Sequence, residues 1–197
     1  MTATDHHRDL VALAINVIES STADAWRHHG FGLLSLYVTP AHRINMWSED
    51  LRQIQPHEGA WHTRGSTIHS TVLAGSVCNS RIVRSHRGTM LDAWVVHDGD
   101  LIPSDRYPVI ANVREPASFG PRSGYLTQRG CGHCTEPGVR GAVTSVLIMG
   151  VGEKPAEIWV PTGTEPKRAF DNRCSDEVIN RVRANSLVLL REQSDAG

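Results

Sequence analysis

The stretch PHEGAWHTRGSTIHSTVLAG, residues 56–75, decides the fold that we expect for the rest of the chain. It carries three histidines, His57, His62 and His69. A second segment, GYLTQRGCGHCTEPGVRGAVTSVLIMG (residues 124–150), combines a turn with a strand-like run and adds His133. Neutral imidazole is the commonest protein ligand for iron, zinc, copper and nickel, so histidines at strand ends can converge on one metal ion. The two segments predict a small β-barrel metalloprotein, and we expect an enzyme rather than a binding module.

The composition is that of an ordinary globular domain. The chain has 197 residues, of which 40% are hydrophobic and 21% charged, and its formal net charge is -1. Because no basic block stands out, there is no electrostatic case for nucleic acid or an acidic membrane surface as a partner. No apolar run is long enough to span a bilayer, and the first residues lack the features of a secretory signal. We therefore expect a cytoplasmic protein whose partner is a small-molecule substrate.

Apolar periodicity predicts a helix at each end of the chain and strands between them. Residues 5–29 and 175–190 place apolar side chains at three- and four-residue spacings, which is typical of amphipathic helices. Between about residues 31 and 162, short alternating runs are separated by frequent turn signals. The sequence has no strand–helix alternation and no Gly-rich phosphate loop. The expected fold is mostly β: one small antiparallel barrel of the jelly-roll type, in a single domain with an N-terminal and a C-terminal helix.

The segment from about residue 34 to residue 151 resembles the cupins, and most closely the small cupins of the cysteine dioxygenase type. Their first motif is His-x-His, followed after a spacer by Glu or Cys, a strand and a glycine. In this sequence His62 and Arg64 stand in the two histidine places, and His69 stands in the place of the Glu or Cys. The second motif, Gly-x-x-His ahead of a strand, is matched by Gly130 and His133.

The resemblance implies a metal site and an activity. It implies that His62, His69 and His133 bind Fe(II), and that the protein is an oxygenase acting on a small amino-acid-like, thiol or natural-product substrate. We expect Arg64 to lie on the same strand face as His62 and to orient an anionic group of the substrate, for which a guanidinium is well shaped. Tyr125 is a candidate hydrogen-bond donor at the same site. A homodimer is expected by analogy with other cupins.

Two departures from the family pattern keep other functions open. Arg64 cannot ligate a metal, because its side chain stays protonated. The segment after His69 is one residue short, so strict strand alternation turns His69 away from the interior unless a bulge restores it. His57 is the reserve ligand. The alternatives are an isomerase, lyase or hydrolase with zinc, nickel or manganese, and a non-catalytic small-molecule-binding cupin that has lost its metal.

A pair of cysteines permits a further interpretation. Cys131 and Cys134 form a C-x-x-C pattern, which in thioredoxin-like proteins opens a helix and carries out thiol redox chemistry. Here a Thr-Glu-Pro-Gly turn follows, and no βαβ pattern surrounds the pair. We therefore do not expect a thioredoxin fold, and the role of the two cysteines stays open.

Overall fold

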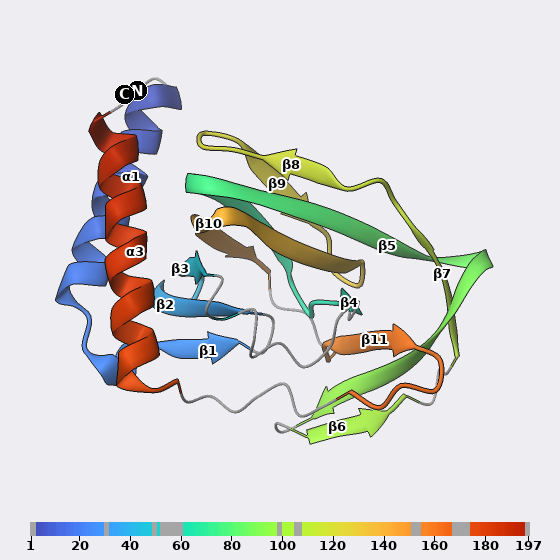
Figure 1. Ribbon diagram of the computed structural model, residues 1–197. Helices are drawn as coiled ribbons and strands as arrows, with labels where there is room; N and C mark the ends of the chain where they lie inside the picture. Colours follow the sequence, from blue (N-terminus) through green and yellow to red (C-terminus); the bar gives the residue numbers. More distant parts are fainter. Residues whose placement is uncertain are drawn as a thin grey trace.

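The structure is a computed structural model, and it describes residues 3–29, 32–48, 51, 61–97, 100–104, 108–150, 155–166 and 174–195. The architecture is a mostly antiparallel β fold with a helix at each end of the chain (Figure 1), which confirms the predicted fold class. None of the helices among these residues has the length and apolar character needed to cross a membrane.

In the described part of the chain, eleven strands belong to one sheet. Their bounds are β1 (Arg27–His29), β2 (Leu33–Thr39), β3 (His42–Trp47), β4 (Trp61–His62), β5 (Thr67–His97), β6 (Asp100–Pro103), β7 (Val109–Val113), β8 (Ala117–Phe119), β9 (Gly124–Thr127), β10 (Gly132–Met149) and β11 (Glu157–Pro161). The strand order is β1-β2-β3-β10-β4-β11-β5-β6, and β7, β8 and β9 also pair with β5. Because β10 pairs directly with β5 as well, the circuit β10–β4–β11–β5 closes on itself around an interior.

The closure depends on the long strand β5. Its first half pairs with β10, and its second half pairs with β11. Between these halves the pairing of β5 with β7 changes register, from Arg84 to Thr89. Gly88 lies in this bend with a φ of +143°, and a Cβ there would lie 2.3 Å from the carbonyl oxygen of Ala111. Glycine is therefore required at the position where the strand turns the corner of the barrel.

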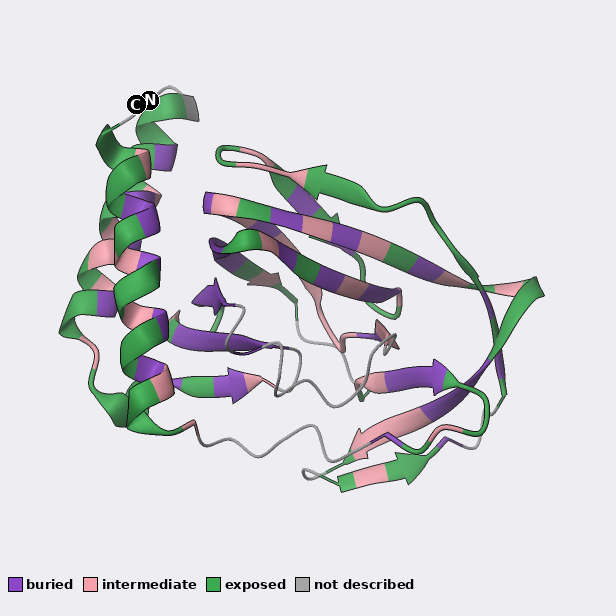
Figure 2. Cartoon of the chain, viewed as in Figure 1, coloured by how far each residue is buried: buried purple, intermediate pink, exposed green. Residues whose placement is uncertain are grey.

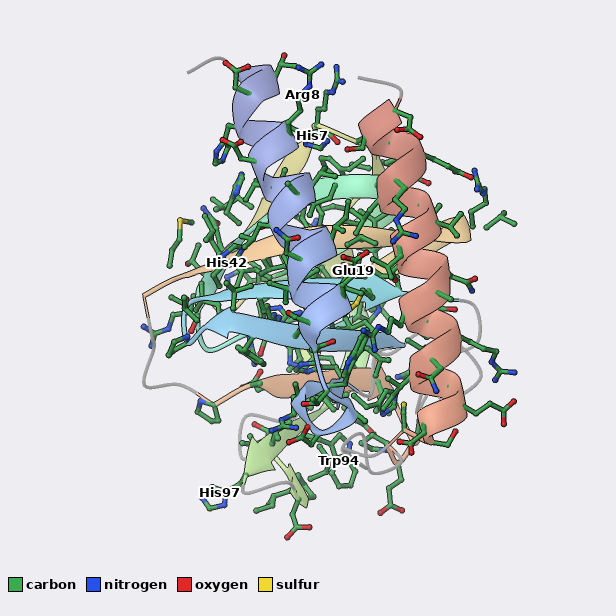
Figure 3. The ribbon with its side chains drawn as sticks, turned by 90° about the vertical axis from the view of Figure 1, so that its left-hand side faces the viewer. His7, Arg8, Glu19, His42, Trp94 and His97 are labelled. Atoms are coloured by element: carbon green, nitrogen blue, oxygen red, sulfur yellow. The ribbon has the colours of Figure 1, made fainter. Side chains whose placement is uncertain are left out.

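Two long helices, α1 (Ala3–Ser20) and α3 (Asp176–Asp195), lie side by side against the sheet (Figures 1 and 3). They bury one face of β2 and β3, where Leu34, Leu36, Ile44 and Met46 join a cluster with the apolar faces of both helices. Buried residues lie on the helix faces turned toward the sheet and along the strands (Figure 2). Both faces of β2 are buried at its start, because the opposite face lines the barrel interior.

The predicted helix boundaries differ from the observed ones at the N-terminus. The helix expected over residues 5–29 ends at Ser20, a short 3-10 turn, η1 (Ala23–Ala25), follows, and residues 27–29 pair with β2 as strand β1. After the helix, Trp26 anchors the chain on the sheet. Its side chain is buried in the helix–sheet cluster, and its indole N–H donates to Ser21 Oγ at 3.0 Å. Strand pairing and this burial outweigh the local helical periodicity.

We expect Met46→Ala to lower the free energy of unfolding by about 2–5 kcal/mol, because Met46 is fully buried between the sheet and the helices. Urea denaturation followed by circular dichroism measures the change. Val139→Ala is the control, since Val139 is 87% exposed and its truncation should stay within about 0.5 kcal/mol of the wild type. Equal effects of the two substitutions would contradict this description of the core.

Candidate functional site

The sheet brings His62 and His133 together in the barrel interior. His62 of β4 and His133 of β10 are direct cross-strand partners, and their ring centroids lie 4.0 Å apart with the ring planes at 55°. The side chains are 5% and 1% exposed, respectively. The same row of paired residues continues from His62 to Ile158 of β11 and then to Trp94 of β5. The two histidines therefore lie in the seam that closes the barrel.

The guanidinium of Arg64 bridges the Nε2 atoms of these two imidazoles. Its Nε donates a hydrogen bond to His133 Nε2 at 3.3 Å, and its Nη2 lies 3.3 Å from His62 Nε2. Arginine has only donors, so the Nε2 atom of each ring must be the acceptor in these contacts. Both histidines are consequently neutral and carry their proton on Nδ1.

The electrostatics of the site agree with neutral imidazoles. Burial is the largest cause that holds the pKa of His62 and the pKa of His133 well below 6.5, and the positive charge of Arg64 acts in the same direction on both. Burial and the nearby Arg43 lower the pKa of Arg64 to about 9. At neutral pH the site is thus a charged guanidinium held by two uncharged rings.

Two further residues of the site, His29 and Arg43, were not predicted from the sequence. His29 lies at the end of β1, and burial, together with Arg43 and Arg64, lowers its pKa to about 3. Its Nε2 atom is buried and has no hydrogen-bond partner among the described residues. Arg43 of β3 is 4% exposed, and its Nη1 donates to the hydroxyl of Tyr37 at 3.2 Å. Every residue of β3 from Arg43 to Trp47 is buried, so its sequence gives no sign of which of them face the cavity.

The structure does not bring His69 to the histidine pair. Ile68 lines the interior cavity, and Ser70 hydrogen-bonds the interior residue Tyr125, so His69 between them points outward. Its cross-strand partners on β9 and β10, Leu126 and Leu147, are 36% and 47% exposed. A bulge does occur before Gly75, but it comes after Val72. Residues 68, 70 and 72 therefore point inward by strict alternation, and His69 stays outside. The three-histidine arrangement expected from the resemblance is therefore not the one observed.

Of the other predicted site residues, Tyr125 is in the interior and His57 cannot be placed. Tyr125 is 6% exposed, hydrogen-bonds Ser70 and Thr135, and packs on Phe119 with ring centroids 4.9 Å apart. Burial raises the pKa of its hydroxyl, while Arg64 is near enough to oppose that shift. His57 lies outside the described residues.

The donor set does not fit the metal site that the resemblance implies. The lone pairs of His62 Nε2 and His133 Nε2 accept hydrogen bonds from Arg64, and a nitrogen used in this way cannot at the same time coordinate an ion. The described residues contain no group of three His, Cys, Asp or Glu side chains that could hold a metal. The guanidinium contacts both Nε2 atoms, so the protein supplies its own cation to them.

A cavity of about 330 Å³ opens beside this cluster. The residues with nitrogen-bearing side chains that line it are His29, Arg43, His62 and Arg64, and Thr63 and Ser66 add hydroxyl groups. The apolar side chains that line it are Leu33, Ile68, Val96, Ile148, Ala156 and Ile158. Glu157 also borders the cavity, but its carboxylate accepts from Arg84 at 2.6 Å and from the Trp159 indole at 2.8 Å. Within the described ranges, no carboxylate pairs with Arg43 or Arg64.

Comparison with known proteins yields weak likenesses only. No family model matches the sequence, and no curated protein matches it. Among solved structures, the chain is similar to a hydroquinone 1,2-dioxygenase in complex with Cd2+ and 4-hydroxybenzonitrile, with a TM-score of 0.35 and 11% identity over 68% of this chain and 69% of that chain. It is also similar to a tryptophan-to-tyrosine variant of oxalate decarboxylase from Bacillus subtilis, with a TM-score of 0.25 and 9% identity over 88% of this chain and 40% of that chain. These likenesses assign neither a family nor an activity.

The buried neutral histidines make stability depend on pH. A histidine whose pKa is lower in the folded protein than in the unfolded chain contributes stability above pH 6.5 and loses it as the pH falls toward the folded value. Between pH 6 and pH 5, His29 should therefore reduce the free energy of unfolding by on the order of 1 kcal/mol. We expect His29→Gln to show a correspondingly smaller loss than the wild type in urea denaturation at the two pH values. Identical pH dependence in the two proteins would show that His29 is not a buried neutral residue.

Proposed function

We propose that this protein binds a small organic anion inside its β-barrel, with Arg64 and Arg43 as the anion-contacting groups. The observation that carries the proposal is that two guanidiniums face one cavity and have no carboxylate partner in the described part of the chain. This is the small-molecule-binding function among those that the sequence leaves open, and it requires no metal.

Desolvation gives the physical reason for an anion. Removing a charged side chain from water is unfavourable unless the charge is paired and its hydrogen bonds are satisfied. The neutral imidazoles accept two of the hydrogen bonds that the Arg64 guanidinium can donate, but they supply no negative charge. The Nε of Arg43 is buried without a hydrogen-bond partner among the described residues. A carboxylate or phosphate group near the two arginines would bring negative charge to them and accept hydrogen bonds from donors that are otherwise unused.

The two histidines act as positioning residues in this proposal. Each accepts one hydrogen bond from Arg64, so together they fix the plane of the guanidinium before a ligand arrives. Holding a flexible side chain in its binding geometry reduces the entropy lost on association and raises affinity. Because both rings stay neutral, they orient the arginine and leave its charge for the ligand.

A second candidate is the metal-dependent enzyme that the cupin resemblance implies, an Fe(II) oxygenase of the dioxygenase type or an enzyme that uses zinc, nickel or manganese. The observation that favours it is the pair His62 and His133 itself, held on facing strands with His29 lining the same cavity as His62. Metal binding by this pair requires Arg64 to leave both Nε2 atoms.

Isothermal titration calorimetry with a small carboxylate, butyrate, at constant ionic strength tests the first candidate. We expect Arg64→Gln and Arg43→Gln each to weaken binding about ten- to a hundredfold, as is typical for the loss of charge-assisted hydrogen bonds. Arg191→Gln is the matched control, because Arg191 pairs with Glu19 on the helix surface. Unchanged affinity in both cavity variants would exclude the proposed site.

Metal analysis separates the two candidates. Protein purified without chelator and then incubated with Fe(II) should retain clearly less than one ion per chain if Arg64 holds both histidines. One tightly bound iron per chain, lost in His133→Ala but not in a His69→Ala control, would instead support the metal-dependent enzyme. His69 suits the control because it lies on the outer face of β5.

A further inference from the structure

We infer that the anion carries an apolar body: the cavity selects an aliphatic or aromatic monocarboxylate over inorganic phosphate and over dicarboxylates. This inference rests on the proposed function, since it concerns the same cavity. It goes beyond that function by naming the chemical class of the ligand from the walls that surround the two arginines.

The walls of the cavity change from polar to apolar directly beside the two arginines and the histidines. Ile158 is the cross-strand neighbour of His62, and Leu33 is the cross-strand neighbour of His29. Apolar side chains therefore begin immediately beside the polar ones, on β11 and on β2. Both Leu33 and Ile158 are 2% exposed. A ligand whose carboxylate reaches the arginines must place its next atoms against these side chains.

The apolar wall continues away from the arginines. Ile68 of β5 and Ile148 of β10 face each other as direct cross-strand partners, and Val96 lines the cavity from the other half of β5. Ile68 is buried, whereas Ile148 and Val96 are partly exposed. The wall thus extends from the buried interior toward solvent, which gives an elongated ligand apolar contacts along its length.

The placement of the charges argues against a second anionic group on the ligand. Among the described residues that line the cavity, both unpaired cations, Arg43 and Arg64, belong to its polar part, and the carboxylate of Glu157 is paired with Arg84. A charge at the far end of an elongated ligand would therefore meet no described cation. A second carboxylate would lie against Leu33, Ile68 or Ile158 and lose its hydration without compensation. Inorganic phosphate would leave the apolar wall in contact with water. A monocarboxylate with a hydrocarbon body meets both parts of the cavity.

The test is a chain-length series measured by calorimetry at constant ionic strength, with acetate, butyrate, pentanoate, benzoate, succinate and inorganic phosphate. Each methylene that the cavity buries should tighten binding about fourfold. Pentanoate and benzoate should therefore bind at least tenfold more tightly than acetate, and succinate at least tenfold more weakly than butyrate. Binding that depends on Arg64 but not on chain length, or a preference for phosphate or succinate, would overturn this inference and leave the proposed function standing. Absence of any Arg64-dependent binding would overturn the proposed function itself.

Two adjacent residues provide matched variants. Ile148 faces the cavity, whereas Met149 is its neighbour on β10 and is 46% exposed. Ile148→Ser should weaken pentanoate binding about tenfold and leave acetate binding unchanged, while Met149→Ser should change neither. An equal loss for acetate and pentanoate in Ile148→Ser would contradict the assigned role of this wall. The chain-length series on the unaltered protein decides the question if Ile148→Ser does not fold.

Discussion

The contact of the Arg64 guanidinium with the Nε2 atoms of His62 and His133 is the interaction on which the site depends. It exists only because the row that joins β10, β4, β11 and β5 places both histidines on the inner side of the barrel. A slip of one residue in that register would turn one imidazole outward and leave the guanidinium with a single acceptor. The short strand β4 therefore both links β10 to β11 in the closed sheet and places His62 in the interior.

The arginine that bridges the two histidines reverses the sign of the charge that the cavity attracts. Imidazole nitrogens that converge on an open position attract a cation, whereas here the protein already supplies a cation to them. Arg43 adds a second positive charge within the same cavity. The burial that keeps the histidines neutral also strengthens the field of the two guanidiniums, since charges interact more strongly away from water. Among the described residues, no carboxylate pairs with either guanidinium.

Sequence reasoning reached the mostly β architecture, both terminal helices and the meeting of His62 with His133, because strand periodicity and two motifs carried that information. It placed His69 on the wrong face, because the family motif was followed there, whereas the strand keeps strict alternation from Ile68 to Val72 and its bulge comes only after Val72. It missed His29, because the helix predicted for residues 5–29 includes the residues that pair as β1. Arg43 was not predicted as a site residue. Because β3 is buried on both faces, its sequence does not reveal which residues point inward.

A crystal structure of the protein with 4-bromobenzoate, whose bromine can be located by anomalous scattering, would show whether the barrel binds an anion at the two arginines. We expect the carboxylate within hydrogen-bond distance of Arg64 and Arg43, the bromine toward Ile148 and Val96, and Arg64 still in contact with both imidazoles. A metal ion coordinated by His62 and His133, with Arg64 turned away and no anion in the cavity, would contradict this expectation.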